Sequence, residues 1–92
     1  MRNINEIRDD INEIDKEMAI LFEKRMKLSK EIIDYKMHFS LPIYDQERET
    51  QIIKLNTLNV NNKELIPYYQ DFIKSIMDIS KKYQEQIFNN KK

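Results

Sequence analysis

The sequence predicts an all-α fold with three helices, of which the N-terminal one is the longest. Two observations support this fold class. Apolar residues recur at alternating spacings of three and four over the first third of the chain, which is typical of a helix that buries one face. The 92 residues include no glycine, which argues against tight β-hairpins. A chain of this length forms a single domain, taken here as residues 1–92, with a modest core that oligomerisation would help to complete.

The first helix is predicted from about Asn3 to His38, a stretch without proline or glycine. Its apolar stripe, called the heptad seam below, comprises Ile4, Ile7, Ile11, Ile14, Met18, Leu21, Leu28, Ile32 and Tyr35. At ~1.5 Å per residue this helix would be roughly 50 Å long. That length exceeds what a compact monomer with a radius of gyration of about 13 Å can cover. Something beyond one compact protomer must therefore cover part of the seam.

A connector and a second helix are predicted next. Pro42 disfavours helix at Leu41, so residues 40–44 are expected to be extended. Asp45 is a favourable N-cap for the second helix, which fades in the polar stretch 56–62. The apolar residues of this helix are Ile52, Ile53 and Leu55.

The third helix is predicted to begin near Glu64 or Pro67. Residues 89–92 at its end are expected to fray. Its apolar positions are Tyr69, Phe72, Ile73, Ile76, Met77, Tyr83 and Ile87.

The composition excludes several classes of function. Sixteen basic and sixteen acidic residues cancel, so no overall field favours nucleic acid or a membrane surface. The absence of cysteine excludes disulfides and thiol nucleophiles, and His38 has no second histidine with which to bind a metal. No apolar run approaches the ~20 residues of a membrane span, and no signal peptide is visible. We expect a soluble, cytoplasmic protein without cofactor or metal.

Two cations interrupt the apolar face of the first helix. Arg25 occupies a seam position, where a guanidinium is costly unless an anionic group meets it. The planar guanidinium of Arg25 suits a carboxylate partner. That carboxylate could belong to a ligand or, equally, to a buried Glu or Asp inside a dimer. Lys36 returns to about the same face three turns later, although a lone lysine near a helix end often only extends into water.

Polar residues also interrupt the other two helices. Ser80 breaks the apolar face of the third helix, and Gln84 shares that face four residues on. Arg48 and Glu49 lie in the first turn of the second helix. Each of these residues also has a simpler explanation. Ser80 could hydrogen-bond to its own backbone, and Gln84 could mark only the edge of the apolar stripe. Arg48 and Glu49 could belong to a solvated first turn. Arg8 could likewise form only a surface salt bridge.

Five motifs, in this order and at this spacing, resemble the all-helical class of chorismate mutases. The resemblance extends from Ile4 to Ile87 and is poorest over residues 58–67. The motifs are residues 7–15 (IRDDINEID), 23–25 (EKR), 35–36 (YK), 41–49 (LPIYDQERE) and 80–84 (SKKYQ).

The resemblance implies an intertwined homodimer of three-helix protomers that converts chorismate to prephenate in phenylalanine and tyrosine biosynthesis. It implies that Arg8 from the partner chain, Arg25 and Arg48 handle carboxylates or order the site. It further implies that Lys36 and Gln84 donate to the ether oxygen of chorismate. By the same resemblance, Glu49 accepts from the ring hydroxyl, and Ser80 makes a polar contact with the substrate.

The spacing of two arginines supports a shared site independently. Arg8 and Arg25 are seventeen residues apart, about 25 Å along one helix, and point roughly 100° apart. They cannot grip one small molecule from the same straight helix, so a joint site needs two chains.

Two alternatives remain at this stage. A related lyase that removes pyruvate from isochorismate uses a similar basic pocket, although Glu49 and Ser80 favour the mutase. A non-catalytic helical dimer would explain the heptad seam equally well, but not the spacing of the polar residues. Association with another shikimate-pathway enzyme is left open.

Overall fold

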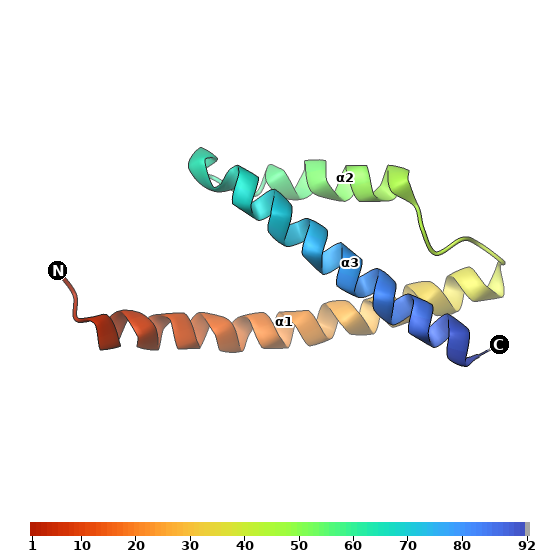
Figure 1. Ribbon diagram of the computed structural model, residues 1–92, viewed down its shortest axis with the longest axis horizontal. Coiled ribbons are helices and arrows are strands. Elements are labelled where there is room, and N and C mark those ends of the chain that lie inside the picture. The colour runs from red at the N-terminus through yellow and green to blue at the C-terminus, as the bar shows by residue number, and fades with distance from the viewer. Residues whose placement is uncertain (92) are drawn as a thin grey trace.

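The computed structural model describes residues 1–91, and this part of the chain is helical apart from its connections (Figure 1). Its elements are α1 (Ile4–His38), α2 (Gln46–Thr57), a 3₁₀ turn η1 (Lys63–Leu65) and α3 (Ile66–Asn90). The predicted all-α class, the three helices and the long first helix are confirmed. Lys92, the last residue of the predicted domain, lies outside the described residues.

α3 is the central element of the protomer. It packs against both α1 and α2, and η1 leads directly into it. Figure 1 shows α3 crossing the C-terminal part of α1, whereas α2 lies along the first half of α3. The N-terminal half of α1 extends away from the other helices.

α1 begins and ends with recognisable capping structures. The Asn3 side chain accepts a hydrogen bond from the backbone N–H of Asn5 at 2.7 Å. At the other end Ser40 has a φ of 55°, and the N–H of Leu41 donates to the carbonyl of Lys36 at 2.7 Å. This is the Schellman arrangement, which usually uses glycine. A chain without glycine must place a non-glycine residue there, at a cost of about 1 kcal/mol. Ser40 therefore departs from the predicted extended connector.

The second and third helices begin close to the predicted residues. Asp45 caps α2, because its side chain accepts from the N–H of Arg48 at 3.0 Å. Pro67 lies in the first turn of α3, where its missing N–H has no helical partner to lose. In the structure α3 continues through Asn90, and the Lys91 ammonium lies 3.0 Å from a carboxylate oxygen of Asp34. The fraying of residues 89–92 stays a prediction, and Lys92 lies outside the described residues.

The buried core is small and half polar. Its members are Ile33, Ile73 and Met77, together with Ser29, Ser80 and Gln84. The predicted apolar face of α3 is confirmed by Ile73 and Met77, although Phe72 remains exposed. The heptad seam does not face α3, because α1 instead presents Ser29 and Ile33, each one residue beyond a seam position. The seam residues themselves stay exposed in the single chain.

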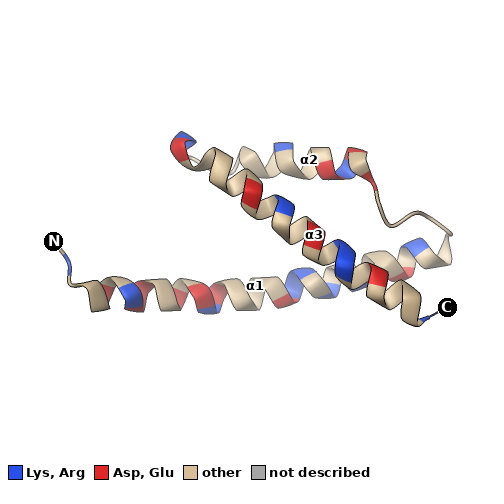
Figure 2. Ribbon diagram, viewed as in Figure 1, with Lys and Arg blue, Asp and Glu red and all other residues tan. Residues whose placement is uncertain are grey.

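The N-terminal half of α1 packs against no other helix among residues 1–91. Residues 1–24 are all exposed, including Ile4 at 57% and Ile14 at 55%. The radius of gyration is 16.6 Å, against about 13 Å for a compact chain of this size. Acidic and basic residues are interspersed along the helices (Figure 2), in keeping with the balanced composition. Among the described residues, no helix combines the length and hydropathy that a membrane span requires.

We predict that the protein is an obligate dimer, because a row of exposed apolar residues along half of α1 is unfavourable in water. Sedimentation over a wide dilution range should show a dimer that loses helicity as it dissociates. Ile11→Lys, which places a charge on the seam, should shift this equilibrium towards monomer at least tenfold. Asn12→Lys changes the charge equally beside the seam and should have a much smaller effect. A stable, fully helical monomer would contradict the prediction.

Candidate active site

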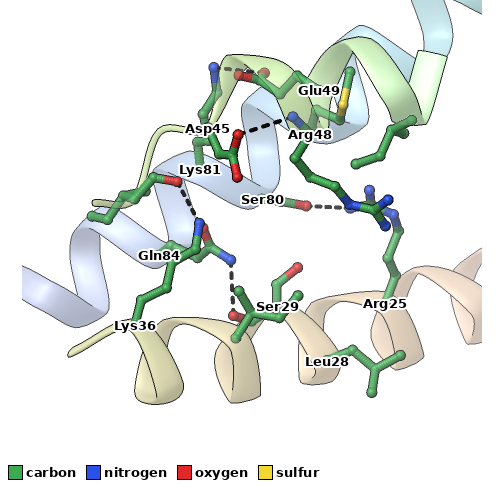
Figure 3. Close-up of a pocket in the computed structure, with 14 residues that line it drawn as sticks. Arg25, Leu28, Ser29, Lys36, Asp45, Arg48, Glu49, Ser80, Lys81 and Gln84 are labelled. Atoms are coloured by element: carbon green, nitrogen blue, oxygen red, sulfur yellow. Dashed lines mark hydrogen bonds and ion pairs between the residues drawn. The ribbon is translucent and has the colours of Figure 1, made fainter. Parts of the chain in front are cut away.

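A pocket of about 430 Å³ lies between the second half of α1, the connector, the start of α2 and the second half of α3 (Figure 3). This volume is within the range of small-molecule sites. Six of the seven predicted site residues line it: Arg25, Lys36, Arg48, Glu49, Ser80 and Gln84. Its remaining lining residues are Leu28, Ser29, Ile32, Ile43, Asp45, Ile52, Met77 and Lys81.

Arg25 crosses from α1 to α3. Its Nη1 donates to Ser80 Oγ at 2.5 Å, and the same hydroxyl lies 4.0 Å from the sulfur of Met26. Ser80 therefore does not bond back to its own helix, and among residues 1–91 the partner of Arg25 is a serine hydroxyl rather than a buried carboxylate. This hydrogen bond joins two helices and also fixes the direction of the guanidinium.

Arg25 and Arg48 bring two positive charges into one part of the pocket, as Figure 3 shows. Burial lowers the pKa of Arg25 below its ordinary value, and the nearby Arg48 lowers it further, against a smaller opposing effect of Tyr69. Within residues 1–91, no ion pair with a carboxylate is formed by Arg25, Lys36 or Arg48. Neighbouring cations without counter-charges are typical of an anion-binding site.

Lys36 and Gln84 are held by backbone carbonyl groups. Lys36 is half-buried, and its ammonium donates to the carbonyl of Ile43 at 2.8 Å, so it does not simply extend into water. Gln84 is only 6% exposed and donates through Nε2 to the carbonyl of Ser29 at 3.0 Å. It is therefore a core residue rather than the edge of a stripe. Each retains further N–H donors, two on the ammonium and one on the amide.

Glu49 forms an ion pair that the sequence interpretation missed. Its Oε1 lies 3.1 Å from the ammonium of Lys81, while its Oε2 is buried without a hydrogen-bond partner among residues 1–91. The hydrogen bond to Glu49 is the main cause of the raised pKa of Lys81. Glu49 is thus not part of a solvated surface, and one of its oxygens is free to accept. The spacing of Lys81 from Asp78 predicts only a surface i,i+3 pair, so no sequence signal points to this contact.

Arg8 lies outside this pocket. It is exposed on the free half of α1, seventeen residues before Arg25 on the same helix. One protomer therefore does not bring the two arginines together, as the spacing argument requires. The contribution of Arg8 from a second chain stays a prediction.

Fold and pocket together define an all-helical protein whose pocket is lined by four cationic and two carboxylate side chains. Comparison with known families then places it: residues 7–85 match the model of chorismate mutase type II. The chain belongs to the type II chorismate mutase family. The predicted family and the predicted enzyme class, an isomerase, are confirmed by this match.

Individual relatives agree with the family model. The chain is 31% identical over 97 residues to the chorismate mutase of Methanocaldococcus jannaschii, covering 100% of this chain and 98% of that protein. It is 32% identical over 90 residues to the bifunctional chorismate mutase/prephenate dehydratase of Aquifex aeolicus, covering 89% of this chain but 25% of that protein. The T-protein of Haemophilus influenzae is 33% identical over 58 residues, which are 63% of this chain and 15% of that protein. No solved structure matches the chain.

We predict that the facing arginines weaken the ligand-free fold. Arg48→Gln removes one of two like charges and should leave the midpoint of thermal unfolding unchanged or raise the free energy of unfolding by a few tenths of a kcal/mol. Lys81→Met is the matched control, because it removes a cation that has a carboxylate partner, and it should lower the midpoint. A clear loss of stability in Arg48→Gln would show that Arg48 has a structural role.

Proposed function

We propose that this chain is a chorismate mutase that rearranges chorismate to prephenate, for phenylalanine and tyrosine biosynthesis, in the pocket described above. One observation carries the proposal. Three cations without carboxylate partners among residues 1–91 line one pocket of about 430 Å³ together with Glu49, whose Oε2 is buried without a hydrogen-bond partner in that part of the chain. Chorismate has two carboxylates, an ether oxygen and a ring hydroxyl. The pocket offers a suitable partner for each of these groups.

The reaction is a pericyclic rearrangement and needs no nucleophile, metal or proton transfer. Two effects accelerate it: holding the reactive folded conformer and stabilising the negative charge that develops on the ether oxygen. Lys36 and Gln84 stabilise the charge on the ether oxygen, because each is already held by a backbone carbonyl and has a further N–H group to donate. Donors fixed in advance need no reorganisation when the ether bond breaks.

The substrate carboxylates are bound by the guanidinium groups. The pocket lining contains four cationic and two carboxylate side chains, which leaves two positive charges for a dianion. Arg25 is directed by its hydrogen bond to Ser80, which also offers its hydroxyl as a polar contact, and Arg48 lies nearby. Glu49 accepts a hydrogen bond from the ring hydroxyl through its free oxygen.

The functional unit is an intertwined homodimer in which Arg8 of each chain completes the site of the other. The exposed seam on α1 and the position of Arg8 on the same free half of that helix support this arrangement. The proposal includes a cytoplasmic location. It also includes association with another shikimate-pathway enzyme, a view supported by the bifunctional name of the Aquifex relative.

The direct test incubates the purified protein with chorismate and follows its loss and the formation of prephenate. The expected result is stoichiometric conversion. Pyruvate release from isochorismate, in the absence of mutase turnover, would indicate the lyase instead. A folded dimer that converts neither substrate would indicate a non-catalytic helical module.

We predict that Arg8 acts in trans. Arg8→Ala and Arg25→Ala should each be nearly inactive, because each dimer then lacks one guanidinium in both sites. Co-refolding the two variants should restore roughly a quarter of wild-type activity, since half of the dimers are mixed and each mixed dimer has one intact site. A mixture as inactive as its parents would contradict the shared site.

We predict that Gln84 keeps turnover nearly independent of pH between about pH 5 and 8, because an amide donates at any pH. The turnover of Gln84→Glu at neutral pH should be about 10²- to 10³-fold lower than that of the wild type. An ionised carboxylate would there face both the Ser29 carbonyl and the developing oxyanion. Activity should rise only partly towards pH 5, since a protonated carboxyl has one O–H in place of two N–H donors.

The measurement is turnover against pH, with helicity checked at each point. Gln84→Met, which has no donor at any pH, is the control and should show the loss without the acid recovery. Wild-type activity of Gln84→Glu at pH 8 would remove Gln84 from the catalytic residues.

A further inference from the structure

Lys81 contacts groups from three parts of the fold at the pocket wall. Its ammonium lies 3.1 Å from Glu49 Oε1 of α2 and 3.5 Å from Asp78 Oδ1 of α3. It also lies 4.9 Å from the centroid of the Tyr44 ring in the connector, a distance suited to a cation–π contact. An ammonium held by these three groups is not free to bind a substrate carboxylate. Its role must lie in what it does to its neighbours.

The ion pair with Lys81 makes the two oxygens of Glu49 different. Oε1 is occupied by the ammonium, whereas Oε2 is buried without a partner among residues 1–91. A buried acceptor without a donor costs free energy, which a ligand that brings a hydroxyl would recover. The ion pair thus leaves one carboxylate oxygen available to accept a hydrogen bond from a donor outside the described chain.

Lys81 also keeps Glu49 away from the other cations of the pocket. Without its own counter-charge, a half-buried carboxylate would gain by turning towards the nearest unpaired guanidinium. Arg25 and Arg48 are such groups, and both line the same pocket. A Glu49 paired with either would occupy a guanidinium that the proposed function assigns to a substrate carboxylate.

We propose that Lys81 is a positioning residue that fixes Glu49 with Oε2 free, and so makes the site selective for a substrate ring that carries a hydroxyl. The inference rests on the proposed function and adds to it the residue that sets this selectivity. The readout is the ratio of kcat/KM for chorismate to kcat/KM for the analogue that lacks the ring hydroxyl. A merely structural residue would lower both values together and leave the ratio unchanged.

The test compares Lys81→Met with wild type on both substrates. Loss of a hydrogen bond to a charged group predicts that the ratio falls about tenfold or more, almost entirely through chorismate, with the analogue changed less than about threefold. Glu49→Gln should reduce the ratio similarly. Lys81→Arg keeps the cation and should preserve most of the ratio. Lys82→Met is the matched control, because Lys82 is the adjacent, exposed lysine outside the pocket lining, and it should leave the ratio unchanged.

The outcomes separate the two proposals. If wild-type protein does not convert chorismate, the proposed function fails. If it converts chorismate but Lys81→Met keeps the wild-type ratio, or loses both activities equally while folded, the positioning role of Lys81 is overturned and the function stands. Should Lys81→Met not fold, Tyr44→Leu removes only the ring beside the ammonium. That variant should then lower the ratio by a smaller factor, and an unchanged ratio overturns the inference.

Discussion

The crossing of α3 over the second half of α1 is the interaction on which the rest of the structure depends. Two hydrogen bonds link the helices there: Gln84 donates to the Ser29 carbonyl at 3.0 Å, and Arg25 donates to Ser80 at 2.5 Å. Ile33, Ile73 and Met77 supply the only buried apolar side chains among residues 1–91. The same hydrogen bonds that join the helices also orient the donors of the pocket. Fold and site therefore share their key residues.

Because the same polar residues serve both the fold and the site, the stability of the single chain is limited. Buried polar groups stabilise a fold only when they are paired, and each contributes less than a well-packed apolar residue. Two guanidiniums near one another and one unpaired carboxylate oxygen add a further cost in the ligand-free pocket. The apolar residues of the heptad seam on α1 are exposed in the single chain. In the proposed dimer a second copy would bury them, and this burial would offset the cost of the polar site.

One carboxylate of the pocket, that of Glu49, forms an ion pair with Lys81. The ion pair of Glu49 with Lys81 leaves Arg25, Arg48 and Lys36 for anionic groups of a ligand. Under the proposed function, this electrostatic pattern would select both the number of ligand carboxylates and the position of a hydroxyl donor. It does so without a metal or a nucleophile in the proposed reaction, whose transition state differs from its ground state mainly in charge distribution.

The sequence by itself determined the helices, their order and their caps, because periodicity, Asn3, Asp45 and Pro67 act over a few neighbouring residues. It also pointed to six residues that line the pocket. Arg25, Lys36, Ser80 and Gln84 interrupt apolar helix faces, whereas Arg48 and Glu49 were indicated by the family resemblance. Only the tertiary structure decided which face of α1 meets α3 and that Lys81 pairs with Glu49. These features depend on how helices far apart in sequence cross, and no local spacing encodes that angle or register.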